Sequence, residues 1–327
     1  MTRWFNVAGP CHPDIHYMLS ALDRLPDLTR LIAQQSYFVL HAPRQTGKTT
    51  AMLALAQELT TSGQWTAVVL SVEVAASFSD QPSLAESAIL SSWREDALVR
   101  LPVDLQPPAW PAAEPGSAIR AALRAWAQAS PRPLVVLIDE IDSLRDATLI
   151  SVLRQIRTGY YDRPHAFPHA LALIGMRDVR DYKVAAGGSS RLGTASPFNI
   201  KSRSLTLGNF SATEVAALYT QHTQATGQIF TPEATAHAFH LTQGQPWLVN
   251  ALAKVAVEDL APDPATPITP DLIDAAKEVL IQRQDTHLDS LAERLREPRV
   301  RAVIEPLLAG LMLGNLLPDD LRFVQDL

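Results

Sequence analysis

The sequence is poor in cysteine and in uninterrupted apolar runs, and both shortages exclude classes of protein. Cys11 is the single cysteine among 327 residues, so no internal disulfide can form, which suits a reducing compartment. No run of about 18 apolar residues occurs, so the sequence predicts no membrane-spanning helix. The first residues carry no apolar core of the kind that a signal peptide needs. We therefore expect a cytoplasmic protein with no membrane partner.

An excess of positive charge is also missing. There are 28 basic and 34 acidic residues, with a net charge of −6 and a pI of about 5.8, so no global positive field points to nucleic acid. The hydrophobic fraction of 47% and the charged fraction of 19% are ordinary for a soluble globular protein. The length allows more than one domain.

The most informative stretch is HAPRQTGKTT, residues 41–50. It follows an apolar run at Tyr37–His41 and precedes residues 51–59, whose apolar positions have helical spacing. Strand, loop and helix are the context of a phosphate-binding loop, G-x-x-x-x-G-K-[ST]. Alanine is tolerable at the first position because the chain leaves the strand there, where small size matters more than positive φ. The predicted nucleotide-binding residues are Ala42, Pro43, Arg44, Gln45, Thr46, Gly47, Lys48, Thr49 and Thr50.

Each part of this loop has an expected role. Backbone amides of residues 43–48 would surround a β-phosphate, and Gly47 would permit the close approach. Lys48 would place its ammonium against the β- and γ-phosphates, and the Thr49 hydroxyl would ligate Mg²⁺. The following helix N-terminus favours the anion further. ATP and Mg²⁺ are therefore the predicted cofactors.

A second motif, LVVLIDEID at residues 134–142, predicts a buried strand that ends in two carboxylates. Open α/β sheets bind ligands at this carboxyl edge. Asp139 would hold Mg²⁺, and Glu140 would polarise a water for attack on the γ-phosphate as a general base. Asp142 is expected to be a solvated or helix-capping acid. The two motifs together predict ATP hydrolysis.

Two further segments supply candidate residues. In LIGMRD (173–178), Arg177 would reach the γ-phosphate as a sensor or finger; the alternative is a surface ion pair with a nearby aspartate. In TQGQPWLVNALA (242–253), a rigid Gly-x-Pro turn would lay Pro246 against an adenine ring. Trp247 behind it is expected in the core of a helical lid rather than in a stack with the base.

The order of elements predicts an α/β fold, a P-loop NTPase αβα sandwich with a parallel five-stranded sheet. The expected strands are residues 37–41, 65–74, 134–138, 171–175 and 204–208. After Gly208 the pattern is helical, with a capping box at Ser211–Glu214 and an N-cap at Thr231 followed by proline. The predicted domains are a core (1–208), a helical lid (209–262) and a helical, winged-helix-like region (263–327) that is incomplete.

These motifs together resemble the AAA-like branch of bacterial P-loop ATPases, close to the STAND group of signal-transducing ATPases. APRQTGKTT is similar to their G-P-R-Q-x-G-K-[ST] loop, IDEID to their acidic motif, GMRD to their T-T-R-D sensor and GQPWLVN to their lid motif. FNVAGPCHPDIHYM, SPFNI with SLTLGNF, and EPRVRAVIEPLLAG with PDDLRFVQDL look like one bacterial AAA-like family. Two positions depart from the pattern: Ala42 replaces a glycine, and no Thr-Thr precedes Arg177.

The resemblance implies an ATPase core, a lid, a winged-helix-like domain and an N-terminal segment that helps to frame the nucleotide. Larger members continue into a region that resembles a PD-(D/E)XK nuclease fold. The sequence ends at DDLRFVQDL, which is expected to be the middle of a winged helix. No nuclease motif maps onto these residues, and we expect no such activity from them.

Three functions remain open at this point. The leading hypothesis is an ATP-binding and hydrolysing switch in signalling or defence, in which nucleotide state moves the lid and the C-terminal helices. Turnover would be slow in isolation if a neighbouring subunit supplies the arginine finger. The second hypothesis is a DNA-binding ATPase of the origin-recognition or transposition-regulator kind, with ATP as a structural ligand. The third is a scaffold that self-associates or binds a protein partner.

Overall fold

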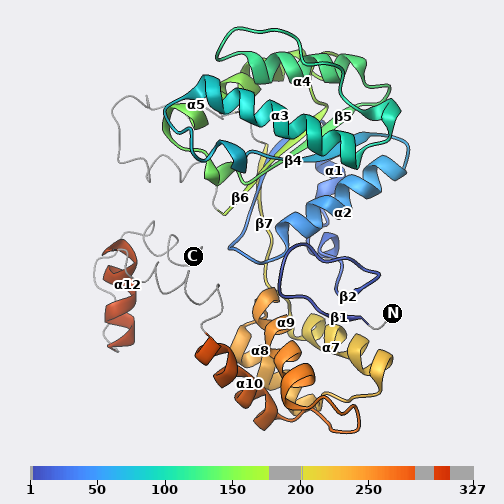
Figure 1. Ribbon diagram of the computed structural model, residues 1–327, viewed down its shortest axis with the longest axis vertical. Helices are drawn as coiled ribbons and strands as arrows, with labels where there is room; N and C mark the ends of the chain where they lie inside the picture. The colour runs from blue at the N-terminus through green and yellow to red at the C-terminus, as the bar shows by residue number, and fades with distance from the viewer. Residues whose placement is uncertain (1–2, 177–199, 201, 284–297, 310–327) are drawn as a thin grey trace. The chain divides into compact units, whose positions relative to one another are not determined.

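A computed structural model describes residues 3–176, 200, 202–283 and 298–309. The chain divides into two compact units. The sheet unit consists of Ala21–Ala42 and Lys48–Leu207, and the helical unit consists of Met1–Ser20, Pro43–Gly47 and Gly208–Leu327 (Figure 1). None of the helices in the described ranges combines the length and the apolar character needed to cross a membrane.

The sheet unit is built on five parallel strands in the order β4-β5-β6-β3-β7. These strands are β3 (Tyr37–His41), β4 (Thr66–Ser71), β5 (Leu134–Asp139), β6 (Ala170–Gly175) and β7 (Arg203–Thr206). Every predicted strand is present, although β4 is shorter than the apolar run at 65–74 suggested and β7 begins one residue early. The chain leaves the sheet after Ser71, where a short 3₁₀ turn over Glu73–Ala75 begins. The predicted parallel five-stranded α/β sheet is confirmed.

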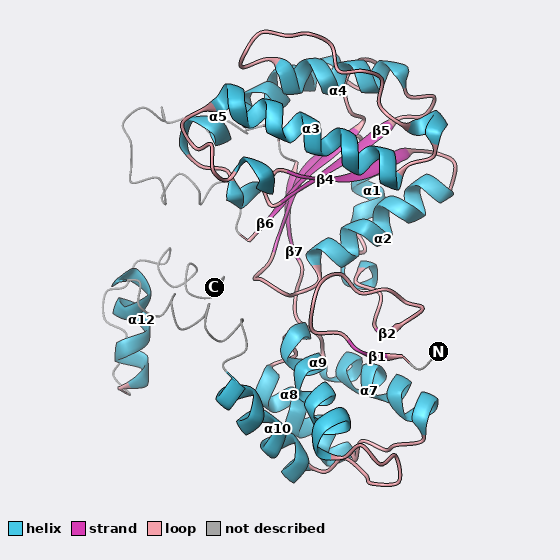
Figure 2. Ribbon diagram, in the orientation of Figure 1, coloured by secondary structure: helices cyan, strands magenta, loops and turns pink. Residues whose placement is uncertain are grey.

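Helices cover both faces of this sheet, as Figure 2 shows. They are α1 (Leu28–Ala33), α2 (Lys48–Thr61), α3 (Pro82–Arg100), α4 (Ala118–Ala129) and α5 (Asp146–Gly159). Alternate residues of β5 enter two different cores, because successive side chains of a strand point to opposite faces. Val136 and Ile138 pack in the core that holds α3, α4 and α5, whereas Val135 and Leu137 pack in the core that holds α1 and α2. The expected αβα layering follows.

The helical unit contains most of the remaining helices. They are α7 (Ala212–Thr226), α8 (Pro232–Thr242), α9 (Pro246–Lys254), the π-helix η6 (Val255–Leu260), α10 (Pro270–Arg283) and α12 (Pro298–Leu308). Ser211 and Glu214 form the predicted reciprocal capping box, and Gly227 ends α7 in the left-handed conformation. Thr231 caps α8, with a proline at its first turn. These local predictions are confirmed.

The N-terminal segment belongs to the helical unit. Strands β1 (Trp4–Phe5) and β2 (His16–Tyr17) pair in parallel, and Phe5 and Tyr17 lie in the same core as Tyr219 and Phe230. The rings of Tyr219 and Phe230 stack with centroids 4.3 Å apart. The division at residues 208 and 262 and the winged-helix character of the last region stay predictions.

Candidate functional site

The first position of the phosphate-loop motif continues strand β3. The Ala42 amide donates a hydrogen bond to the Gly175 carbonyl at 3.2 Å, and the Ala42 side chain is fully buried. Its φ is not positive. The backbone conformation at Ala42 therefore does not require glycine. This agrees with the expectation that the position requires a small side chain.

Left-handed backbone is found further along the loop instead. Gln45 has a φ of 60° and Gly47 a φ of 92°, while the Thr46 hydroxyl donates to the Pro43 carbonyl at 3.0 Å. Such turns direct successive backbone N–H groups to one side and make anion-binding concavities. The positive φ of Gln45 could not be read from the sequence, because glutamine has no preference for this conformation.

Lys48 begins α2, so its charge lies at the positive end of a helix dipole. Its ammonium donates a hydrogen bond to the Ala42 carbonyl at 2.7 Å. The side chain thus reaches back along the loop, and the cation is held beside the backbone that the motif predicts to contact phosphate. Thr49 and Thr50 follow in the first turn of the same helix.

Thr49 and Asp139 come together although 90 residues separate them. The Thr49 hydroxyl donates to one carboxylate oxygen of Asp139 at 2.8 Å, and the other oxygen accepts the Glu140 amide at 2.9 Å. Asp139 is 5% exposed. The last residue of β5 and the first turn of α2 therefore present a hydroxyl and a carboxylate side by side at the carboxyl edge of the sheet.

Glu140 follows in the left-handed conformation, with φ 58° and ψ 37°. A non-glycine residue in this conformation carries backbone strain, which is common at functional sites. Burial raises the pKa of the Glu140 carboxyl, and Asp142, Asp139 and Glu73 raise it further, while Lys48 lowers it. Glu140 is therefore a better proton acceptor than an ordinary glutamate, once it is ionised.

Asp142 has a role that the sequence did not reveal. Its carboxylate accepts the Met176 amide at 3.2 Å, so it joins the turn after β5 to the end of β6. It is half-buried, not the solvated or capping acid that was expected. Met176 is the residue before Arg177, and Arg177 itself lies outside the described residues.

Pro246 begins α9 in the helical unit, as predicted, and is buried. The Trp247 indole N–H donates to the Val7 carbonyl at 2.8 Å, and its ring lies in the core of this unit, which agrees with the lid-core expectation. Gln245 was missed by sequence reasoning. It caps α9 through the Leu248 amide, and its side-chain N–H₂ donates to the Arg44 carbonyl of the loop at 3.4 Å.

The order of the elements and these contacts identify the structural class of the protein. A loop with two left-handed residues joins the inner strand β3 of a parallel sheet to a helix, and an acidic pair ends β5, which is separated from β3 by β6 alone. This is the arrangement of a P-loop NTPase.

Comparison with known protein families agrees with this structural class. Residues 38–158 match the model of the ATPase family associated with various cellular activities (AAA), so the chain contains an AAA-type ATPase domain. A search of curated proteins finds no match.

Solved structures resemble the whole fold at low sequence identity. The Walker-type ATPase of Pyrococcus abyssi is 12% identical with a TM-score of 0.60, covering 98% of this chain and 91% of that one. The Aeropyrum pernix ORC1 protein in complex with DNA is 15% identical with a TM-score of 0.53, covering 91% and 74%. The Aeropyrum pernix ORC2 protein, in ADPNP and ADP complexes, is 14% identical with a TM-score of 0.50, covering 98% and 81%. These likenesses establish the α/β fold.

Proposed function

We propose that this protein binds ATP with Mg²⁺, hydrolyses it, and acts as a nucleotide-dependent switch. The observation that carries the proposal is the 2.8 Å hydrogen bond between the Thr49 hydroxyl and the Asp139 carboxylate. It joins the end of the phosphate loop to the acidic motif, the two parts from which ATP chemistry was predicted.

The donor set fits magnesium. A threonine hydroxyl and a carboxylate are hard oxygen ligands, which Mg²⁺ prefers, and both are held at one sheet edge. Thr49 and Asp139 would hold the ion, Asp139 through its carboxylate and Thr49 through its hydroxyl oxygen. When bound, Mg²⁺ offsets the negative charge of the phosphates.

The chain's own residues would carry the remaining roles. Backbone amides of residues 43–48 would hold the β-phosphate, and the Lys48 ammonium would move from the Ala42 carbonyl to the β- and γ-phosphates. Glu140 would orient a water and accept its proton, a role to which its raised pKa is suited. Arg177 would act on the γ-phosphate, and Pro246 would contact the adenine.

The switch is supported by a contact within the helical unit. Gln245 connects the Arg44 carbonyl to the first turn of α9, so a phosphate that reorders the loop would also disturb the N-terminus of this helix. We infer that nucleotide state is transmitted along this route to the lid helices. The proposed setting is the cytoplasm, with self-association or a protein partner completing the mechanism.

Two substitutions test the proposal. Lys48→Ala should abolish ATP binding, whereas Glu140→Gln should keep binding and lower turnover by about 10²–10⁴-fold. Binding is measured by equilibrium dialysis with radiolabelled ATP, and turnover by phosphate release. Lys277→Ala and Glu95→Gln, on α10 and α3, are matched controls and should change neither. Full turnover by Glu140→Gln would remove the general base from the proposal, and ATP binding by Lys48→Ala would remove the loop.

One comparison favours a second candidate, a DNA-binding ATPase in which ATP is a structural ligand. The Aeropyrum pernix ORC1 protein, which shares the fold, was solved in complex with DNA. A DNA-binding role predicts affinity that falls steeply with salt, because released counterions drive such binding. Fluorescence anisotropy with duplex DNA over a salt series distinguishes the two: absence of binding with intact ATP turnover leaves the switch.

A further inference from the structure

Two consecutive residues at the end of strand β6 contact two other parts of the candidate site. The Gly175 carbonyl accepts the Ala42 amide at 3.2 Å and so holds the first residue of the phosphate-loop motif. The Met176 amide donates to the Asp142 carboxylate at 3.2 Å. Because β6 lies between β3 and β5 in the sheet, its end connects the start of the loop to the acidic turn after β5.

The Asp142 contact differs from that of an ordinary acid in a turn. Aspartate side chains in turns commonly bond to the backbone of the same turn. The 3₁₀ turn Ile141–Ser143 is instead closed by backbone bonds, with the Ser143 amide 2.9 Å from the Glu140 carbonyl. The half-buried Asp142 carboxylate accepts an amide 34 residues away in the chain. This bond is therefore not needed to form the turn, and it fixes the turn to a neighbouring strand.

Glu140 begins this turn in the left-handed conformation, which persists in a non-glycine residue only where the surrounding structure holds it. On one side, the Asp139 carboxylate accepts the Glu140 amide at 2.9 Å. On the other side, the fully buried Ile141 packs in the core that holds α3, α4 and α5, and Asp142 is bonded to β6. Asp142 therefore anchors the far side of the turn that carries Glu140.

This anchor acts on the proposed hydrolytic group and not on the groups proposed to hold ATP. The Asp142 turn begins at Glu140, whereas the phosphates would be held by the loop and by Lys48. Loss of the anchor should let Glu140 shift, while the bond between Gly175 and Ala42 keeps the start of the loop in place. A shift of about 1 Å in a reacting group can cost on the order of 10²-fold in rate.

We propose that Asp142 is a positioning residue for Glu140. By accepting the Met176 amide, its carboxylate holds the turn in the arrangement that places Glu140 against the attacking water. Asp142 acts through Glu140 and serves hydrolysis, not ATP binding. The inference rests on the proposed function, because it requires Glu140 to be the general base.

The test compares two substitutions of Asp142 in the full chain. Asp142→Ala removes the acceptor and should lower kcat about 10–10²-fold with an unchanged Kd for ATP. Asp142→Asn keeps an acceptor oxygen in a side chain of the same shape, so kcat should stay within about threefold of the wild-type value. Phosphate release gives kcat at alkaline pH, where Glu140 is ionised in every variant. Equilibrium dialysis with radiolabelled ATP gives Kd.

A double-mutant cycle separates positioning from a general loss of structure. Adding Asp142→Ala to Glu140→Gln should not lower the residual rate further, because the group that Asp142 positions is already gone. Asp263→Ala is the matched control and should change neither kcat nor Kd, since the Asp263 carboxylate also accepts a backbone amide, that of Ala265 at 3.0 Å, but lies in the helical unit. If Asp142→Ala does not fold, Asp142→Ser gives the same comparison, because its shorter side chain retracts the polar group from the Met176 amide.

Three outcomes would overturn the inference alone. Equal losses of kcat in Asp142→Ala and Asp142→Asn would show that the charge matters and the hydrogen bond does not. A loss of ATP binding as large as the loss of kcat would show that the contact only supports the fold. A further loss of rate in the double variant would show that Asp142 acts independently of Glu140. Full turnover by Glu140→Gln would instead remove the general base and this inference together, so the two kinds of failure are distinguishable.

Discussion

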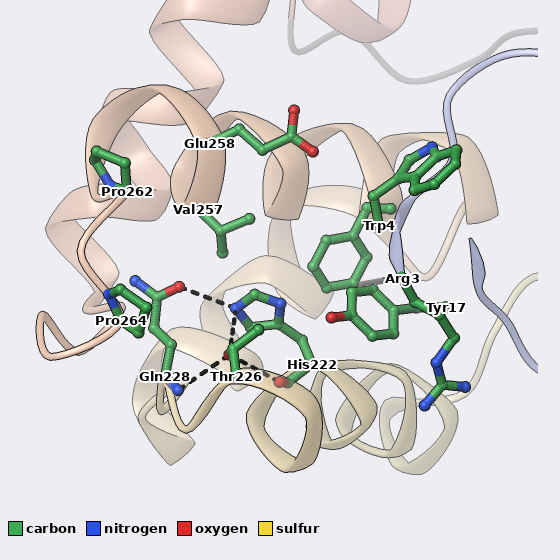
Figure 3. A pocket seen from close by; sticks show the side chains of 11 residues that line it. Arg3, Trp4, Tyr17, His222, Thr226, Gln228, Val257, Glu258, Pro262 and Pro264 are labelled. Atoms are coloured by element: carbon green, nitrogen blue, oxygen red, sulfur yellow. Dashed lines mark hydrogen bonds between the residues drawn. The ribbon is translucent and has the colours of Figure 1, made fainter. Parts of the chain in front are cut away.

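The polar groups of the sheet unit and of the helical unit are arranged in opposite ways. At the carboxyl edge of the sheet they are charged and paired with one another: Thr49 with Asp139, Asp139 with the Glu140 amide, and Asp142 with the Met176 amide. Among the packed aromatic rings of the helical unit, the Tyr17 hydroxyl and the His222 Nδ1 lack hydrogen-bond partners within the described residues (Figure 3). The sheet edge therefore holds charged groups whose existing contacts a charged ligand would replace, whereas the Tyr17 hydroxyl and His222 Nδ1 are enclosed by neighbouring aromatic rings.

The two units should also differ in how single substitutions affect them. The sheet edge depends on chemistry, so conservative substitutions there should change rates more than stability. The helical unit depends on close backbone contacts and caps, so substitutions there should change stability more than rates. Four predictions follow this contrast, from the largest effect to the smallest.

Asp139→Asn should reduce Mg²⁺-dependent ATP hydrolysis by about 10²–10³-fold, because an amide oxygen cannot supply the negative charge that the ion and the transition state require. The shape of the side chain is kept, so the fold should remain. Phosphate release over a Mg²⁺ titration measures the effect. Asp80→Asn, at an exposed position, is the control; a wild-type rate for Asp139→Asn would contradict the assignment.

Gly244→Ala should destabilise the helical unit by about 3 kcal/mol or more. Gly244 has a φ of +72°, and a Cβ there would lie 1.9 Å from the Phe210 carbonyl oxygen. Gly63→Ala, in the sheet unit, is the matched control, since Gly63 has a φ of +77° and open space around it. It should cost only about 1–2 kcal/mol, the backbone strain alone. Urea unfolding measures both, and equal losses would show that the close contact is relieved.

Ser211→Ala should lower the free energy of unfolding by about 1 kcal/mol, because the capping box that begins α7 is lost. Ser87→Ala within α3 is a helix-surface control, where the hydroxyl donates to the carbonyl one turn earlier. This control should be neutral or slightly stabilising. Thermal unfolding compares the two, and an equal effect would argue against the cap.

Glu73→Gln should shift the pH dependence of ATP turnover. Burial is the main cause of the raised pKa of Glu140. The negative charges of Asp142, Asp139 and the exposed Glu73 raise this pKa further, and the positive charge of Lys48 lowers it. A general base works when ionised, so turnover is full above this raised pKa and is lost as the pH falls through it. Removing the Glu73 charge lowers the pKa, so the acid limb of the kcat/KM profile should move to lower pH while the alkaline rate is unchanged. A limb that stays in place would show that another group titrates there.

The sequence predicted the sheet unit well, for a physical reason. Buried parallel strands are continuous apolar runs, and a phosphate loop must be contiguous, so Tyr37–His41, residues 41–50 and residues 134–142 carry their signals locally. The capping box at Ser211 is local in the same sense. The roles of Lys48, Thr49, Asp139, Glu140 and Pro246 were also inferred from local patterns, and they stay predictions.

Other features could not be predicted from the sequence. Asp142 and Met176 are brought together by the sheet order, in which β6 lies beside β5, and no local pattern encodes that neighbour. Gln45 and Glu140 take left-handed backbone that their side chains do not favour, so tertiary context imposes it.

The contacts of His222 show this division most clearly. By itself the sequence determined where an anion-binding loop, an acidic strand end and several helix caps must lie, because each depends on residues within a few positions of one another. Only the tertiary structure decided that Tyr17, from the N-terminal segment, faces His222 at the end of α7, and that Gln228 fixes which imidazole nitrogen holds the proton. Those contacts form because segments distant in the sequence pack into one core, so local sequence patterns cannot predict them.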